Sequence, residues 1–374
     1  MKTAYAASGH TEIVDSSLAV EDLFSQLGEI DPAAIFIFNS IKQDGSELAE
    51  RFDSRWPKAE IVGCSTAGEI SDKRSGLDGV SVLALERTVV GKCTAAIADF
   101  SSGIDQGVEE AIRSIEATTG PLRELDPKRW VGIVLIEGTH GSEERTNQLL
   151  GNVAPMLSFV GGSAGDSLAF EETLIYQPDK STTRGAALIL MEMKRPFHIL
   201  KTCHFEPTEK KLVPNKVRGR LVQEFNGRPA AEAYAEAIGV SEKELGPAVF
   251  FPNPVGLMID GSPWLRSPAP FGHEGSSIAF ACEVPEGAQL YLMRRACPII
   301  EDSHDALQKA LETLGSQIQA GLFFSCAYRR LEMDAEGSHE DFVSLLDFPA
   351  AGFHTHGESW LGHINQTMTS LLIG

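Results

Sequence analysis

Short apolar runs alternate with amphipathic stretches along the chain, and this alternation predicts strands and helices in turn. The amphipathic stretch at residues 17–27 predicts a helix, and the continuous apolar run at 33–38 has the length of a strand buried on both faces. A second helix is expected at 47–52. A glycine-containing stretch at 61–70 and a strand at 79–85 follow.

The same order of segments returns twice more. In the second pass, strands, helices and a glycine stretch are expected at residues 92–98, 108–115, 130–136, 143–150, 161–166 and 186–191. The third pass begins near residue 289, with segments at 289–293, 305–314, 320–326, 340–346, 352–358 and 367–373. About three repeated β-α-β-α-β-β units therefore predict an α/β fold with mixed sheets.

One part of the chain does not follow this repeat and guides the division into domains. Within residues 196–288, the polar, proline-bounded run at 207–216 predicts a linker or an exposed loop. A turn ending at Pro229 predicts the start of a helix at 230–238. We therefore expect two domains. Residues 1–200 form an N-terminal domain of two repeated halves, and residues 201–374 form a C-terminal domain.

Charge and hydropathy exclude several classes of partner. The 32 basic and 52 acidic residues give a net charge of −20, which disfavours binding to nucleic acid or anionic lipid. No apolar run approaches the roughly 20 residues of a membrane span, and the first residues lack the apolar core of a signal peptide. We expect a cytoplasmic protein with no nucleic-acid or membrane partner. The six scattered cysteines include no C-x-x-C pair, so most should be small core residues.

The three glycine stretches carry the residues best suited to bind a ligand. Each has an apolar lead-in, small or hydroxyl residues, and a glycine followed by a carboxylate, namely Glu69, Asp166 or Glu358. Main-chain N–H groups in such turns hold anions, and a carboxylate suits an ammonium group, so together they could bind a zwitterion such as an amino acid. Alternatively, each carboxylate caps its own turn.

The third stretch also offers candidate ligands for a metal ion or a haem iron. His354 and His356 are two residues apart, so in an extended segment both imidazoles point to the same face. His363 is a third candidate, although spacing identifies no complete ligand set. The alternative is that these histidines are ordinary hydrogen-bonding groups.

Two residues could act as nucleophiles in an enzyme. Gly161–Gly165 fits the G-x-S-x-G pattern, with Ser163 as a hydrolase nucleophile, and Cys64 is a candidate for thiol chemistry. No general base is placed near either residue by the sequence. A glycine turn is the better interpretation, and we predict that the protein is not an enzyme.

Taken together, the motifs resemble those of the FIST family of bacterial sensory modules, which have an N-terminal and a C-terminal FIST domain. The resemblance rests on residues 62–69, 161–166, 226–230, 324–329 and 352–358. It implies a signal-input protein that binds a small ligand, with amino acids proposed for the family, and passes the signal to a separate partner. Some members resemble haem-binding nitric-oxide sensors that act on histidine kinases.

We therefore predict a cytoplasmic signal-input protein that binds a small molecule, with an amino acid as one candidate. A haem-based nitric-oxide or redox sensor acting on a histidine kinase is the first alternative, and a hydrolase using Ser163 is the second. The candidate ligand-binding residues are Ser65, Thr66, Glu69, Ser163, Asp166, Arg329, His354, His356 and Glu358.

Overall fold

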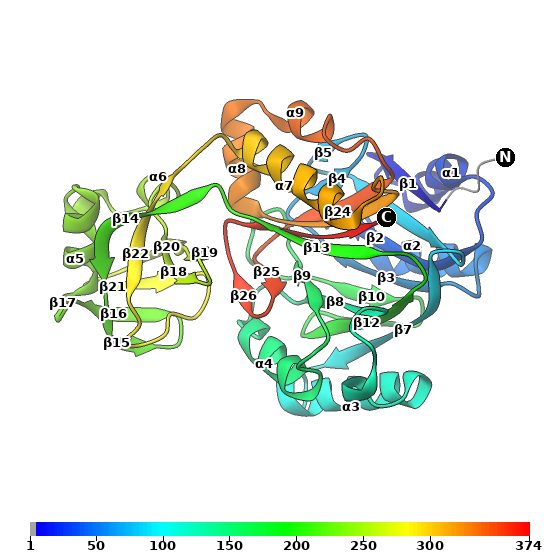
Figure 1. Cartoon of the computed structure of the whole chain (residues 1–374), viewed down its shortest axis with the longest axis horizontal. Helices are drawn as coiled ribbons and strands as arrows, with labels where there is room; N and C mark the ends of the chain where they lie inside the picture. Colours follow the sequence, from blue (N-terminus) through cyan, green and yellow to red (C-terminus); the bar gives the residue numbers. More distant parts are fainter. Residues whose placement is uncertain (1–4) are drawn as a thin grey trace. The chain divides into compact units, whose positions relative to one another are not determined.

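The computed structural model describes residues 5–374 and divides into two compact units (Figure 1). The larger unit comprises the described residues up to Lys201, together with Ser303–Gly362 and Met368–Gly374. The smaller unit comprises Thr202–Asp302 and His363–Thr367. These units group elements by packing. The division into an N-terminal domain, 1–200, and a C-terminal domain, 201–374, that we expect from the sequence differs from these units and remains a prediction.

The larger unit contains the three repeated passes. The elements of the first pass are β1 (Ala6–Thr11), α1 (Ser16–Leu27), β2 (Pro32–Asn39), α2 (Gly45–Arg55), β3 (Glu60–Ser65), β4 (Glu69–Ser71), β5 (Ser75–Gly76) and β6 (Val80–Glu86). Those of the second are β7 (Val90–Asp99), α3 (Ile104–Thr119), the 3-10 helix η1 (Leu122–Glu124), β8 (Trp130–Ile136), α4 (Glu143–Val153), β9 (Phe159–Ser163), β10 (Ile175–Gln177), β11 (Lys180–Thr182) and β12 (Gly185–Met193).

The third pass begins with a strand that the sequence analysis did not assign to it. Its elements are β13 (Phe197–Thr202), α7 (Ile299–Leu314), β23 (Ala320–Cys326), α8 (Ala327–Glu336), α9 (His339–Val343), β24 (Ala350–Thr355), β25 (Glu358–Trp360) and β27 (Met368–Ile373). The start predicted near residue 289 is wrong, because that strand is β22 (Leu290–Arg295) in a sheet of the smaller unit. Local pattern cannot distinguish the two strands, since only their pairing partners differ.

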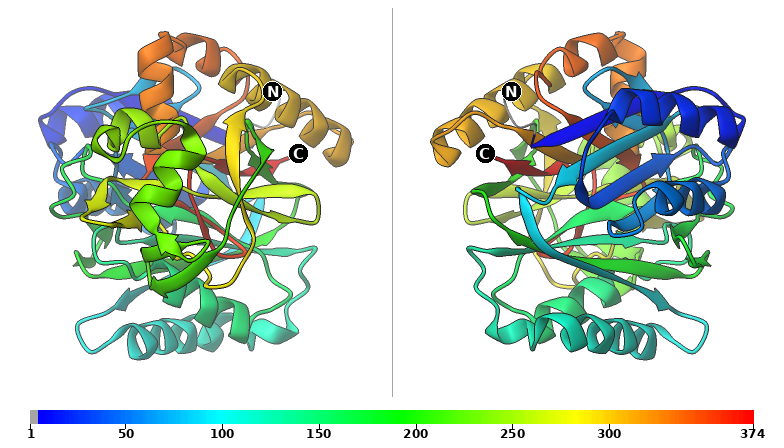
Figure 2. Two further views of the ribbon diagram at one scale, coloured as in Figure 1. Left: turned by 90° about the vertical axis from the view of Figure 1, so that its left-hand side faces the viewer. Right: turned by 90° about the vertical axis from the view of Figure 1, so that its right-hand side faces the viewer.

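Three mixed sheets form the body of the larger unit. Their strand orders are β1-β6-β2-β3-β10-β11, β25-β9-β8-β12-β7 and β13-β27-β23-β24-β4-β5. In each sheet the two central strands of a pass run parallel, and the closing strand is antiparallel to them. Helices α1 and α2 cover one outer side, α3 and α4 another, and α7, α8 and α9 the third (Figures 1 and 2). The predicted α/β fold with mixed sheets is confirmed.

Each pass contributes a hairpin or short strand to the sheet of another pass. The segment that follows the first glycine turn, β4 with β5, pairs with β24 of the third pass. β10 with β11, from the second pass, pairs with β3 of the first, and β25, from the third, pairs with β9 of the second. This cyclic exchange joins the ends of β3, β9 and β24, and it therefore brings the three glycine turns together.

The core lies between the inner faces of the three sheets. It includes Phe38 from β2, Phe324 from β23 and Phe353 from β24, and none of the three is exposed. Their ring centroids are 5.0 Å apart for Phe38 and Phe353, and 5.8 Å apart for Phe324 and Phe353. The continuous apolar runs seen in the sequence are therefore strands covered by a sheet on one face and by helices on the other.

The smaller unit has two antiparallel sheets, two α-helices and a 3-10 helix among its described residues. Its elements are β14 (Phe205–Leu212), β15 (Pro214–Arg218), β16 (Leu221–Phe225), β17 (Arg228–Pro229), α5 (Ala230–Ile238), η2 (Glu242–Glu244), α6 (Pro247–Phe250), β18 (Val255–Ile259), β19 (Ser262–Arg266), β20 (Pro268–Glu274), β21 (Ser277–Phe280), β22 and β26 (His363–Ile364). The sheet orders are β14-β22-β18-β19 and β15-β16-β21-β20.

The linker predicted at residues 207–216 is wrong, because this run forms most of β14 and β15. Glu209, Lys210 and Lys211 are exposed, and β14 lies at the edge of its sheet. Its pairing with β22 is irregular between Pro207 and Lys211. The polar composition therefore marks an exposed edge strand, where charges and proline are tolerated.

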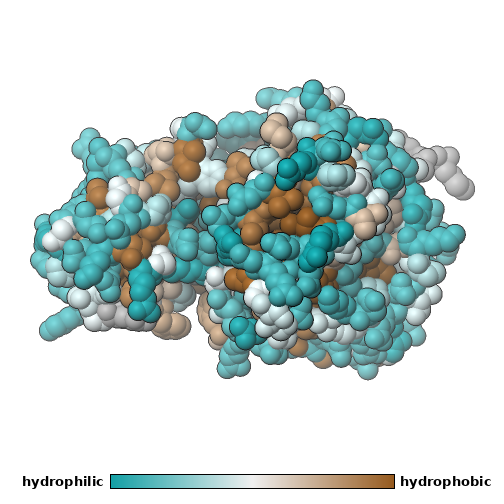
Figure 3. Space-filling model, turned by 90° about the horizontal axis from the view of Figure 1, so that it is seen from below, coloured by the Kyte–Doolittle hydropathy of each residue, from teal (hydrophilic) through white to brown (hydrophobic). Residues whose placement is uncertain are grey.

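Some hydrophobic side chains reach the surface of the larger unit. The face of the larger unit shown in Figure 3 is mostly hydrophilic, with hydrophobic residues gathered near its middle. Met156, just after α4, is 70% exposed.

Among the described residues, no helix is both long enough and apolar enough to cross a membrane.

Candidate functional site

The three glycine turns meet where β3, β9 and β24 end. Main-chain hydrogen bonds join them in all three pairs: Ala67 N–H to His354 O (3.0 Å), His354 N–H to Gly68 O (2.7 Å), His356 N–H to Ser163 O (3.1 Å), Ser163 N–H to Gly357 O (2.8 Å) and Gly165 N–H to Ser65 O (3.0 Å). Four of the nine candidate ligand-binding residues, Ser65, Ser163, His354 and His356, take part in these hydrogen bonds. Sequence spacing could not show this contact.

In two of the turns, a threonine hydroxyl donates to the carboxylate three residues later. The hydroxyl of Thr66 donates to Glu69, and that of Thr355 donates to Oε1 of Glu358 at 2.6 Å. The second oxygen of Glu69 accepts the main-chain N–H of Gly79 at 2.8 Å. Both carboxylates are buried. This geometry matches the alternative in which each carboxylate caps its own turn.

Burial changes the acidity of Glu69. It raises the pKa of this carboxyl from 4.5 to about 7, against the opposing effect of hydrogen bonds from Thr66 and Gly79. Because the folded state binds the proton more tightly, protonation stabilises the fold. That contribution is fully present below pH 4.5 and is lost as the pH rises through about 7.

A Glu69→Gln variant should reveal this dependence. The original protein should lose up to about 3 kcal/mol of unfolding free energy between pH 5 and pH 8 that the variant does not lose. The reason is that glutamine at position 69 does not titrate. Urea unfolding at both pH values measures the difference. Glu29→Gln, at an exposed side chain, is the control and should show no such change. A pH-independent difference for Glu69→Gln would contradict the assignment.

Asp166 is held differently, by the loop that follows it. Its carboxylate accepts the main-chain N–H groups of Phe170 (2.9 Å), Glu171 (2.6 Å) and Glu172 (3.2 Å). Within this loop Ser167, Leu168 and Phe170 all have positive φ angles, of 59°, 71° and 57°. Side chains with a Cβ rarely adopt this conformation, so the loop is strained around the carboxylate.

His356 lies between Asp166 and the end of β8. Its Nδ1–H donates to the carbonyl oxygen of Gly138 at 3.2 Å, and its ring stacks on Phe170 with centroids 4.6 Å apart. Its Nε2 is 3.6 Å from Oδ1 of Asp166 and, although buried, has no hydrogen-bond partner. Burial lowers the pKa of His356, and the charge of Asp166 opposes this shift only in part. In the neutral ring, an unpaired lone pair therefore faces a carboxylate.

His354 faces a different set of groups. Its Nε2 is 3.1 Å from the hydroxyl oxygen of Ser75, and its buried Nδ1 has no hydrogen-bond partner. Burial lowers the pKa of His354 well below its ordinary value, and Arg330 adds to this effect. The two imidazoles expected to share one ligand thus contact different segments. His363 lies in the smaller unit, where its Nε2 is 3.4 Å from the carbonyl oxygen of Ala281.

These positions do not fit a haem iron as they are arranged. The ring of His354 is completely buried beside Ser75, and that of His356 is covered by Phe170. A porphyrin needs an open face beside the ligating imidazole. Among the described residues, no group of three histidines, cysteines or carboxylates is placed to hold a metal ion. The haem alternative stays a prediction.

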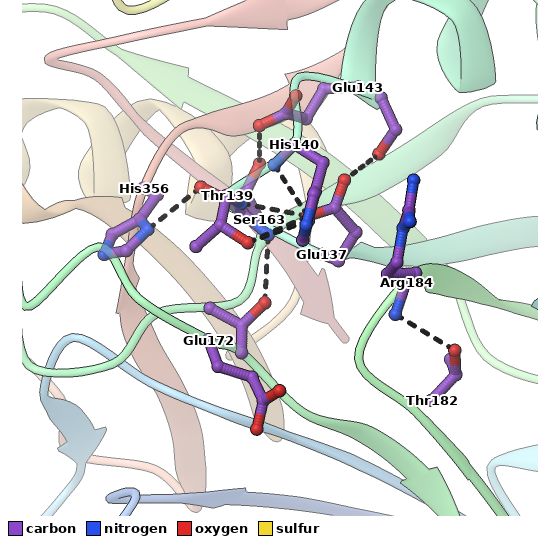
Figure 4. A network of polar contacts seen from close by, with 12 residues as sticks. Glu137, Thr139, His140, Glu143, Ser163, Glu172, Thr182, Arg184 and His356 are labelled. Carbon is purple, nitrogen blue, oxygen red and sulfur yellow. Dashed lines mark hydrogen bonds and ion pairs between the residues drawn. The ribbon is translucent and has the colours of Figure 1, made fainter. Parts of the chain in front are cut away.

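The two proposed nucleophiles, Ser163 and Cys64, are both buried. Ser163 donates to Oε1 of Glu143, at the start of α4, at 3.2 Å, and β9 is followed by a loop instead of the helix of a nucleophile elbow (Figure 4). Burial raises the pKa of the Cys64 thiol well above its ordinary value, so it stays protonated at neutral pH.

Arg329 is buried and contacts side chains outside the three turns. Its guanidinium donates to the hydroxyls of Ser303 (2.9 Å) and Ser325 (3.3 Å). Its neighbour Arg330 instead donates to the carbonyl oxygen of Ala67, in the first turn, at 2.6 Å. Consecutive helical residues face different directions, so the Arg-Arg pair alone could not identify which one reaches the turn.

Sequence reasoning missed Glu137, which directly follows β8. This buried carboxylate accepts hydrogen bonds from the Ser142 hydroxyl (2.6 Å), from the N–H groups of Thr139 and His140, and from the His140 ring (2.9 Å each) (Figure 4). Burial would raise its pKa, but these hydrogen bonds outweigh burial and lower it. The sequence did offer one signal for Glu137, namely a carboxylate directly after an apolar run that predicts a buried strand.

Comparison with known proteins places the chain in a family. A model of the FIST N domain matches residues 33–228, and a model of the FIST C domain matches residues 230–360. An uncharacterized protein of Methanocaldococcus jannaschii is 23% identical over 209 residues, which cover 54% of this chain and 40% of that protein. The chain thus spans less than half the length of this relative. Because the two models match most of its length, the chain belongs to the FIST family, whose domains are sensory domains of signal transduction.

Proposed function

We propose that this protein is a signal-input protein that binds a small ligand at the junction of the three glycine turns. The ligand carries a nitrogen that donates hydrogen bonds, as the ammonium group of an amino acid does. One observation carries the proposal. Nε2 of His356 is buried without a hydrogen-bond partner and lies 3.6 Å from Oδ1 of Asp166, which accepts the main-chain N–H of Phe170. A ligand ammonium group, with several hydrogens, would donate to both acceptors.

The surroundings of this acceptor pair support a ligand. Two acceptors facing each other are unfavourable in a buried site, and a buried polar group without a partner costs about 1–3 kcal/mol. A bound ammonium ion removes this cost and contributes attraction to the carboxylate.

The loop after Asp166 offers a way to report binding. Phe170 stacks on His356 yet is 43% exposed, and the loop holds three residues in the left-handed region. A ligand that contacts Asp166 competes with the N–H groups of residues 170–172 and thereby releases backbone strain. The changed loop then presents a different surface to a separate signalling protein, such as a histidine kinase.

A thermal-shift screen of the common amino acids and simple amines tests the proposal. A ligand at 100 times its dissociation constant should stabilise the protein by about 2.7 kcal/mol, and Asp166→Asn should weaken binding at least tenfold. Asp99→Asn is a matched control, because Asp99 is an exposed carboxylate that also accepts a main-chain N–H. The proposal fails if no compound shifts the melting temperature, or if Asp166→Asn binds the ligand unchanged.

A further inference from the structure

A chain of hydrogen bonds leads from the surface of the larger unit to the buried His354. Oδ1 of Asp334 is 2.7 Å from Nε2 of His339, and Nδ1 of His339 is 3.0 Å from the hydroxyl oxygen of Ser75. The same hydroxyl oxygen is 3.1 Å from Nε2 of His354. The exposed fraction falls along this chain, from 46% for the Asp334 side chain to 19% for that of His339 and 0% for His354.

The positions of the hydrogens follow from the chemistry of the four groups. The carboxylate of Asp334 only accepts, so Nε2 of His339 carries a hydrogen. The hydroxyl of Ser75 has one hydrogen, so it donates to one imidazole and accepts from the other. When His339 is neutral, Ser75 donates to its Nδ1 and accepts from Nε2–H of His354. Nδ1 of His354 then carries a lone pair, in agreement with its lack of a partner.

Charging His339 reverses both hydrogen bonds of Ser75, while Nε2–H of His339 still donates to Asp334. Nδ1–H of His339 then donates to Ser75, and the Ser75 hydroxyl donates to Nε2 of His354. Because His354 stays neutral, its hydrogen must now be on Nδ1. The two states differ by one proton. A proton that enters at Nδ1 of His354 displaces the Nε2 proton to Ser75, whose own proton moves to Nδ1 of His339.

Electrostatics favour the charge at the surface end. Burial disfavours a positive charge on His354, and the charges of Arg330, His339 and Arg329 add to this effect. His339 instead contacts Asp334, whose other oxygen is 3.4 Å from Nε of Arg330. The remaining charged groups on its helix, Glu340 and Asp341, are acidic. A proton released into this chain is therefore stabilised on His339.

We propose that Asp334, His339 and Ser75 form a proton relay that couples the ring nitrogens of the buried His354 to a charge on His339 at the surface. The inference rests on the proposed function, because it takes the ligand at the glycine turns as the donor that meets Nδ1 of His354. A hydrogen-bond donor there needs the lone pair on Nδ1, so it favours the state in which His339 is neutral, whereas lowering the pH favours the state in which His339 is charged. The relay thus links the buried turn to a surface that a partner can read.

Ser75 contacts the His339–Asp334 pair, an arrangement that in other proteins can activate a serine. In the neutral state, its oxygen already accepts Nε2–H of His354, which lowers its nucleophilicity. Ser75 is itself buried. We therefore assign Ser75 as a positioning residue.

Nitrogen-15 NMR of histidine-labelled protein tests the relay without any ligand, because ring nitrogens with and without hydrogen have very different shifts. As the pH is lowered, the hydrogen of His354 should move from Nε2 to Nδ1 when His339 becomes charged. In Ser75→Ala, His339 should still titrate while His354 no longer changes. His304→Gln, at an exposed histidine paired with Asp305, is the control and should leave the switch intact.

A second variant keeps the test decisive if Ser75→Ala does not fold. Asp334→Asn, at a half-exposed side chain, retains an acceptor for His339 but removes the charge, so the switch should move to lower pH. An unchanged hydrogen position on His354 throughout the titration of His339 overturns the relay. This measurement uses no ligand, so it stands or falls separately from the amino-acid screen.

Discussion

A Gly161→Ala variant is expected to lower the free energy of unfolding by about 3 kcal/mol or more, or to prevent folding. A Cβ atom at this position would lie 1.8 Å from the main-chain oxygen of Val134 in the neighbouring strand. Backbone atoms of a central strand cannot move aside without breaking the pairing of β8 with β9. Urea unfolding followed by circular dichroism measures the loss.

Gly151→Ala is the matched control for this variant. Gly151 lies in α4, and an added Cβ there meets no atom within 4 Å. Alanine in a helix interior is favoured over glycine, so this change should stabilise the protein by about 0.5–1 kcal/mol. If Gly161→Ala unfolds at the same urea concentration as the original protein, the close approach of the two strands is contradicted.

Replacing Phe353 by alanine is the second large effect, with an expected loss of about 3–5 kcal/mol. Phe353 is fully buried between the sheets, and its ring contacts those of Phe38 and Phe324. Its removal leaves a cavity in the core that all three passes share, so the larger unit should lose stability as a whole.

Denaturant unfolding of the larger unit measures this loss as well. Met156→Ala, at a side chain that is 70% exposed, should change the free energy of unfolding by no more than about 0.5 kcal/mol. A loss below about 1 kcal/mol for Phe353→Ala would mean that the three sheets do not depend on this common core.

Much of the fold could be predicted because local signals encode it. Residues 33–38, 130–136 and 320–326 are buried strands, as their apolar runs indicated. The third pass was less complete, because α8 begins immediately after β23 and contains two buried arginines that obscure its apolar face. The start of that pass was misplaced since β13 and β22 have similar local patterns and differ only in their partners.

The candidate site was likewise predictable only in part from the sequence. Glycine followed by a carboxylate was visible in the sequence, and all three turns do lie together through the exchanged strands. The partners of the site residues were not visible. Ser75 is 279 residues from His354 and 264 from His339, so no spacing rule could connect them.

The sequence by itself determined the α/β class, the repeated order of elements and the turns that carry polar groups. These properties follow from burial patterns and turn chemistry among neighbouring residues. Only the tertiary structure decided which sheet receives each exchanged strand, which arginine reaches a turn, and which imidazole nitrogens are left without partners. Those outcomes depend on atoms that are distant in the chain and meet only after the sheets have packed. Hydrogen bonding and desolvation depend on which groups are neighbours in three dimensions, whatever their separation in sequence.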